Sequence, residues 1–187
     1  IPTTAPPNVV VSSVTVSGAG TQIGQVRLRD FILHTFNTDI DMTIQSPMGT
    51  VVTLTTDNGG ANENVFNGTL WDDKADPGNQ VPYGVPLAAS RLATDTVYAN
   101  LVVKPTLTAE EGLAAFMGED PNGVWTLTIS DDANLDGGTL TSWSLEVTTV
   151  TCRASCQINC DDANPCTDDS CDPGTGCVHT PNTNPCN

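Results

Sequence analysis

The stretch Gly123-Val-Trp-Thr-Leu-Thr-Ile-Ser-Asp131 alternates apolar and polar residues along its length. In an extended chain, Trp125, Leu127 and Ile129 share one side and the threonines between them share the other. This two-residue period is typical of an antiparallel strand with one buried face. The stretch therefore predicts a core strand, with Trp125 inside the protein.

The same period recurs in short segments along the chain, each ended by turn residues. The segments are Val9–Val16, Val26–Ile32, Met42–Ile44, Val52–Leu54, Leu101–Val103 and Trp143–Val147. About eight such strands predict an all-β protein, a jelly-roll β-sandwich of two sheets. Trp143 falls on an inward phase, so it too is expected in the core.

Two segments depart from this pattern. Thr108–Phe116 carries an N-cap residue with Glu111 three positions later, which predicts a single helical turn. Residues 57–90 are dense in Asn, Asp, Gly and Pro and read as a loop. Loops of that length are uncommon in compact domains unless they are functional or organised by a metal.

Composition divides the chain into three parts. Residues 1–7 form a Pro-rich extended arm or linker, residues 8–151 the sandwich, and residues 152–187 a small disulfide-rich C-terminal appendage. All seven cysteines lie in the last part: Cys152, Cys156, Cys160, Cys166, Cys171, Cys177 and Cys186.

Cysteine spacing favours disulfides over a metal site. No Cys-x-x-Cys pair occurs, and His179 is the one nearby imidazole. Disulfides imply an oxidising location, extracellular or at a cell surface. Seven cysteines cannot all pair within one chain. The four from Cys160 to Cys177 could close two bridges, and we expect Cys186 to be left over.

Charge excludes one class of partner. The formal net charge is -16, with six Lys and Arg residues in 187. So few cations cannot neutralise a phosphate backbone, which excludes nucleic acid. No apolar run reaches the roughly 18 residues of a membrane span, so we expect a soluble chain.

Five stretches of the sandwich together resemble the P domain (Homo B domain). This domain follows the catalytic domain in kexin, furin and bacterial subtilisin-like proteases. The stretches are His34–Ile40, Ile44–Thr50, Gly123–Leu127, Asp131–Asp132 and Gly138–Leu145. The resemblance implies a jelly-roll fold and an upstream protease or other extracellular domain as partner.

No catalytic function is expected of these residues. His34 is the one imidazole of the sandwich, and Ser46 precedes Pro47 in a Ser-Pro-x-Gly-Thr hairpin, not in a nucleophile elbow. We expect His34 to be structural, bonded to nearby backbone or to Asp39. The sequence therefore predicts that the chain is not an enzyme.

The tail resembles a second known type. Residues 160–181 are similar to the short acidic Cys-rich repeats of surface and secreted proteins of myxobacteria and their relatives. A stalk or spacer is the simplest role for such a repeat.

Asp132-Ala-Asn134-Leu-Asp136-Gly matches the first half of an Asp-x-Asn-x-Asp-Gly calcium loop. The bidentate Glu of an EF-hand is missing, because Trp143 stands at its place. The alternative is a hairpin turn whose Asp and Asn side chains bond their own backbone.

A second candidate calcium site lies in the long loop and combines Asp57, Asp72 and Asp73. Adjacent carboxylates repel one another unless a cation neutralises them, and Ca²⁺ would organise a loop with little core. Solvated surface charge is the alternative.

Two functions follow from these observations. The first is a non-catalytic extracellular calcium-binding module that stabilises or tethers an associated secreted hydrolase. The alternative is a structural subunit of an extracellular fibre or surface layer. In that case copies of the chain would assemble through the N-terminal arm and intersubunit disulfides.

Overall fold

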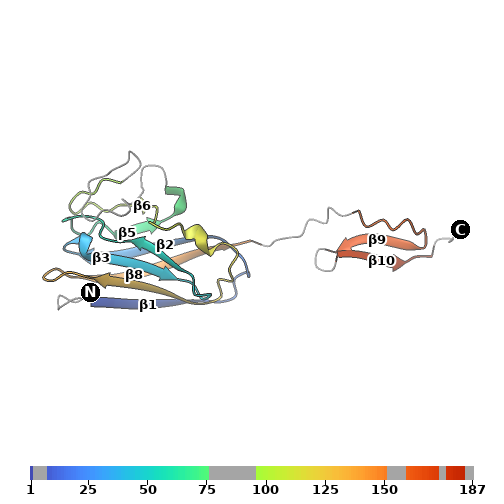
Figure 1. The fold of residues 1–187 in the computed structure, drawn as a ribbon, viewed down its shortest axis with the longest axis horizontal. Helices are drawn as coiled ribbons and strands as arrows, with labels where there is room; N and C mark the ends of the chain where they lie inside the picture. Colours follow the sequence, from blue (N-terminus) through green and yellow to red (C-terminus); the bar gives the residue numbers. More distant parts are fainter. Residues whose placement is uncertain (2–7, 76–95, 151–158, 173–175, 184–187) are drawn as a thin grey trace. The chain divides into compact units, whose positions relative to one another are not determined.

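The computed structural model describes residues 1, 8–75, 96–150, 159–172 and 176–183. The chain divides into two compact units, residues 1–150 and residues 151–187. Each unit is described by itself (Figure 1). No helix in the described ranges is long and apolar enough to cross a membrane.

The first unit is a sandwich of two four-stranded sheets (Figure 1). The first sheet has the order β1 (Asn8–Val16), β7 (Gly123–Asp131), β3 (Ile40–Gln45) and β4 (Val51–Thr55). The second has the order β6 (Thr106–Leu107), β5 (Asn67–Trp71), β2 (Ile23–His34) and β8 (Gly138–Thr149). All pairings are antiparallel except β5 with β6. The predicted all-β sandwich is confirmed.

The core lies between the two sheets and is built from the inward phases of the strands. Trp125 is fully buried, as predicted, and its ring packs edge-on against Phe116 at 5.0 Å between centroids. Trp143 is only partly buried and packs against the core. Its indole Nε1 donates to Ser12 Oγ at 2.9 Å, which links the edge strands β8 and β1.

The predicted Ser-Pro-x-Gly-Thr hairpin joins β3 to β4. The Gly49 N–H donates to the Ser46 carbonyl at 3.0 Å, and Gly49 has φ +94, which glycine adopts without strain. Ser46 Oγ and Thr50 Oγ1 both donate to the carboxylate of Glu119, which holds the hairpin closed.

Two local predictions were wrong, and a third was right about the helical turn but not about its N-cap. Leu101–Val103 is not a strand, and Leu101 and Val102 are exposed. The stretch predicted as a loop contains β5, whose Trp71 is buried in the core. The helical turn is a 3-10 helix, η3 (Leu113–Phe116), that begins five residues after Thr108 and is capped from elsewhere in the chain.

The described part of the second unit is a hairpin of β9 (Thr167–Asp172) and β10 (Gly176–Pro181). None of its described residues is buried. A disulfide joins Cys160 to Cys177, and Cys166 and Cys171 are also disulfide-bonded. Cys152, Cys156 and Cys186 lie outside the described residues, as does the predicted N-terminal arm except Ile1.

Candidate functional site

Three connections meet at one end of the sandwich. They are the β2–β3 connection with helix η1 (Asn37–Asp39), the loop after β4 and the β7–β8 turn. The Asp132 N–H donates to the Asp39 carbonyl at 3.1 Å, and the Thr38 N–H donates to the Gly60 carbonyl at 3.2 Å. These bonds fix the three backbones relative to one another.

Glycine allows the loop after β4 to pack closely on η1. Gly59 has φ +98, and a Cβ placed there would lie 2.6 Å from Cβ of Asn37. Any other residue would therefore both strain the backbone and push η1 away. Asp57, with φ 53, turns the chain in the same loop.

This end of the sandwich gathers carboxylates whose charges act on one another. We call this group the acidic end cluster; its members are Asp39, Asp41, Asp57, Glu110, Asp132 and Asp136.

Burial and repulsion from neighbouring carboxylates disfavour the ionised forms of Asp39, Asp41 and Asp57. Burial, with Asp131 next, raises the pKa of Asp39 to about 6. Burial, with Asp57 and Asp132 next, raises the pKa of Asp41 to about 6. Burial also raises the pKa of Asp57, and Asp132 adds to that effect. The cluster therefore holds negative charge under electrostatic strain at neutral pH.

Glu110 enters the cluster from the segment that follows β6. Its carboxylate accepts from the Thr56 N–H at 2.7 Å and from Asn58 Nδ2 at 2.7 Å. Burial raises the pKa of Glu110 despite these bonds. Glu110 thus ties the loop after β4 to a distant part of the chain.

The structure divides the predicted calcium ligands differently from the sequence. Asp132 and Asp136, from the β7–β8 turn, lie with Asp57 of the other predicted set. Asp136 Oδ1 also accepts from Thr35 Oγ1 at 2.9 Å. Asn134 lies in the same turn and is exposed.

The other two predicted ligands already have protein partners. Asp73 accepts from the Leu113 N–H at 2.9 Å and the Ala114 N–H at 2.7 Å, which caps η3. Asp72 Oδ1 accepts from the Lys74 N–H at 2.9 Å, and its Oδ2 lies 3.7 Å from Arg27. Neither carboxylate is among the groups that raise the pKa values of the cluster.

Three members of the cluster were not predicted: Asp39, Asp41 and Glu110. Asp39 stands in one of the P-domain-like stretches, and the alternation of β3 places Asp41 on the outward face beside it. Those were usable signals. Glu110 lies 54 residues from its partner Thr56, and no local pattern indicates that contact.

His34 is fully buried and bonded to nearby backbone, as predicted, but its carboxylate partner is Asp131 and not Asp39. Its Nε2 lies 3.2 Å from Asp131 Oδ2, and its Nδ1 lies 2.9 Å from the Phe36 carbonyl oxygen. Asp39, the predicted partner, lies one position before β3, whereas Asp131 ends β7 with its side chain turned inward and fully buried.

Carboxylate proximity alone does not make a formed cation site. Among the described residues, Asp162, Asp169 and His179 of the tail are the one group of three titratable side chains with ligand atoms within 4.8 Å of one another. The sandwich carboxylates are close enough to repel but do not converge on one point.

Comparison with known families agrees with this architecture. Residues 87–147 match the model of the proprotein convertase P-domain, and residues 159–182 match the model of the Dictyostelium (slime mold) repeat. The resemblance to the P domain, a non-catalytic domain that accompanies proteases, is confirmed over that range. The tail is similar to a known type of repeat, as expected, and the matching model is named for slime moulds.

Among solved structures, the chain is similar to the serine protease of Aeromonas sobria, at 17% identity and a TM-score of 0.36. The structure of that protease in complex with a chaperone is similar to the chain at 19% identity and a TM-score of 0.34. Each similarity covers 76% of this chain and 27% of the other, so the chain spans about a quarter of that protease. No curated protein matches the chain.

Proposed function

We propose that residues 8–150 form a calcium-stabilised, non-catalytic accessory domain of a secreted hydrolase. The observation that carries the proposal is the acidic end cluster, on a sandwich whose residues 87–147 match a protease-associated domain. The disulfide-bonded tail supports an oxidising, extracellular location.

Calcium suits the cluster because its available ligands are oxygens. Ca²⁺ accepts six to eight oxygen ligands in flexible geometry, from carboxylates, amides and backbone carbonyls. Asp41, Asp57 and Asp132 supply three carboxylates whose repulsion a cation would relieve. Because their oxygens do not yet converge, binding would require these side chains to rotate toward the ion.

A non-catalytic role is supported by the contacts of the two residues with catalytic chemistry. His34 is fully buried and bonded to Asp131 and to backbone. Ser46 is buried at 3% exposure, and its hydroxyl is bonded to Glu119. Neither side chain presents a nucleophile or a base to a substrate.

Thermal unfolding in calcium and in EGTA tests the proposal. Binding to the native state alone contributes about 2.7 kcal/mol at a hundred times the dissociation constant, so calcium should raise the melting temperature of the sandwich. Superimposed curves would contradict calcium binding.

Two variants locate the effect. Asp132→Asn and Asp57→Asn should lose the calcium-dependent gain without lowering the calcium-free melting temperature, because each removes a repelling charge. Asp168→Asn makes the same chemical change in the tail and should keep the gain. If both sandwich variants respond to calcium like wild type, the ion binds elsewhere.

A second candidate function, assembly of copies by strand addition, is favoured by one observation. β1 is the edge of its sheet in the described structure and carries no charged residue, and Val9 and Val11 are 52% and 62% exposed. Uncharged edge strands pair readily with other chains. If copies pair through this edge, the mass measured by sedimentation should rise with protein concentration. Val11→Lys should reduce that rise.

A further inference from the structure

We propose that Asp162, Asp169 and His179 of the tail bind a divalent first-row transition-metal ion, with zinc the closest match. The proposal is separate from the calcium function of the sandwich. It rests on the geometry of the three donors, their chemistry and the groups that orient them.

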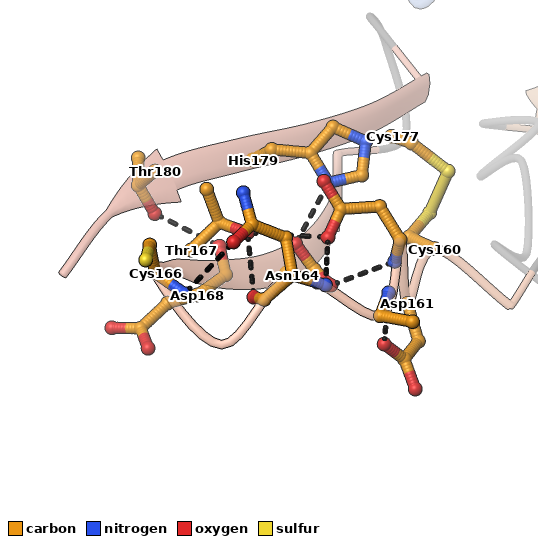
Figure 2. Close-up of polar contacts among 12 residues, drawn as sticks. Cys160, Asp161, Asn164, Cys166, Thr167, Asp168, Cys177, His179 and Thr180 are labelled. Carbon is orange, nitrogen blue, oxygen red and sulfur yellow. Dashed lines mark hydrogen bonds and ion pairs between the residues drawn. A yellow bond between two sulfur atoms is a disulfide. The ribbon is translucent and has the colours of Figure 1, made fainter. Parts of the chain in front are cut away.

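Two of the donors face each other across the hairpin. His179 of β10 pairs in register with Asp169 of β9, and Asp162 lies in the loop before β9. His179 Nδ1 lies 2.7 Å from Asp169 Oδ1 and 3.5 Å from Asp162 Oδ2. Figure 2 shows the imidazole of His179 above this loop, beside the Cys160–Cys177 disulfide.

These separations fit a tetrahedral ion with little movement. Ligand atoms about 2.0–2.1 Å from tetrahedral zinc lie about 3.3 Å from one another. The separations of Nδ1 from Asp169 Oδ1 and from Asp162 Oδ2 fall on either side of that value, and all three donor atoms lie within 4.8 Å of one another.

The donor set selects the class of metal. Imidazole nitrogen with carboxylate oxygen suits zinc and its first-row neighbours, whereas calcium takes oxygen ligands. The side chains of Asp162 and His179 are 36% and 37% exposed, so an ion can enter and a water can complete the coordination. Residues 159–183 contain five Asp and no Lys or Arg, so the charge of this segment favours binding of a cation.

Neighbouring groups hold the free oxygens toward His179. Asp162 Oδ1 accepts from the Asn164 N–H at 2.9 Å and from Thr167 Oγ1 at 3.2 Å, which leaves Oδ2 for the ion. Asp169 Oδ2 accepts from the Asp162 N–H at 3.0 Å, which leaves Oδ1. Such outer contacts orient ligands before the metal arrives.

The test titrates zinc into the full, disulfide-intact and metal-stripped chain, and NMR follows its two imidazoles. One equivalent of Zn²⁺ should shift the His179 ring signals and leave those of buried His34 in place. Because this readout uses the wild type, it does not depend on a variant folding. Shifts in neither ring, or in His34 alone, would overturn the proposal.

Calorimetry on matched variants then assigns the ligands. His179→Gln and Asp162→Asn each remove a proposed ligand and should weaken zinc binding at least about tenfold, since loss of a group that only orients a ligand already costs about 10–100-fold. Asp168→Asn removes the same charge from a neighbouring carboxylate outside the triad and should change affinity less than about threefold. An equal loss in Asp168→Asn would show diffuse attraction to an acidic surface and refute a defined site.

The two metal proposals can fail independently. Asp132→Asn should abolish the calcium effect and leave zinc affinity unchanged, and His179→Gln should do the reverse. Excess calcium should not displace zinc. Loss of zinc binding in Asp132→Asn would place the ion in the sandwich and overturn the tail site.

Discussion

Aspartate side chains occur both in the acidic end cluster of the sandwich and in the tail triad of Asp162, Asp169 and His179, but in opposite settings. In the sandwich, burial raises the pKa values of Asp39 and Asp41 to about 6. In the tail, the hydrogen bond with His179 lowers the pKa of partly buried Asp169 and raises that of the imidazole. The first setting disfavours carboxylate charge, and the second stabilises it.

The scaffolds differ in the same way. The sandwich carboxylates stand mostly on connections between strands, and those strands are fixed by a buried core between two sheets. No described residue of the tail is buried, so its geometry depends on a short hairpin and on disulfides. Acidic composition alone therefore does not define a site, because burial in the sandwich and the His179 hydrogen bond in the tail shift the carboxylate pKa values in opposite directions.

Cutting the tail's covalent support should have the largest effect. Cys160→Ser opens the bridge to Cys177, which spans 17 residues, and removal of a disulfide from a small domain costs about 2–5 kcal/mol. With no buried core to compensate, β9 and β10 should lose amide protection in hydrogen exchange. The melting temperature of residues 1–150, which contain no cysteine, should not change.

A control variant tests whether a side-chain change elsewhere in the hairpin has the same effect. Ser170→Ala in β9 changes an exposed side chain of the same hairpin and should keep its amide protection. If Cys160→Ser leaves the hairpin protected, backbone pairing alone holds the tail, and the contrast drawn between the two scaffolds is wrong.

The second effect concerns a buried carboxylate of the sandwich outside the end cluster. Asp30 is fully buried; its Oδ2 accepts from Trp71 Nε1 at 2.7 Å, and its Oδ1 has no hydrogen-bond partner in the described structure. Burial raises the pKa of Asp30 to about 8, although the Trp71 bond and nearby Arg29 oppose the shift.

The folded state therefore keeps a proton on Asp30 that the unfolded state releases near pH 3.8. This contribution to stability is fully present below that pH and is lost as the pH rises toward about 8. Asp30→Asn keeps an acceptor for Trp71 without a charge. Its melting temperature should fall less than that of wild type between pH 5 and about 8.

Melting curves over this pH range at constant calcium test the expectation. Asp168→Asn, an exposed charge change in the tail, should reproduce the wild-type slope. If the melting temperature of Asp30→Asn falls as steeply with pH as that of wild type, Asp30 does not set the pH dependence of the sandwich's stability.

Regular alternation made much of the sandwich predictable. Trp125, Leu127 and Ile129 are buried as their period required, and Ser46–Thr50 forms the predicted turn. β5 was missed because Asn67 and Gly68 look like loop residues, whereas its burial comes from pairing with β2, about 40 residues away in sequence. Local patterns do not record such distant pairings.

The candidate sites show the same difference between local patterns, which the sequence reveals, and distant contacts, which it does not. A local spacing predicted Asp132 and Asp136. Their proximity to Asp57 arises from the packing of three connections. In the tail, Cys160–Cys177 was among the pairings left open by the sequence. The register that sets His179 opposite Asp169 depends on the hairpin and could not be read from composition.

The smallest effect distinguishes a capping carboxylate from a metal ligand. Asp73 was predicted as a calcium ligand, yet its two oxygens accept from the Leu113 and Ala114 N–H groups at the start of η3. Loss of a capping side chain costs about 0.5–2 kcal/mol. Asp73→Ala should therefore lower the melting temperature of the sandwich by a few degrees.

The dependence on calcium decides between the two roles. A cap should cost the same in calcium and in EGTA, and Asp73→Asn, which keeps one acceptor oxygen, should recover part of the loss. A calcium ligand should cost stability only when calcium is present, because its removal without the ion relieves repulsion. If Asp73→Ala lowers the melting temperature equally in calcium and in EGTA, Asp73 is not a calcium ligand, and the acidic end cluster remains the proposed site.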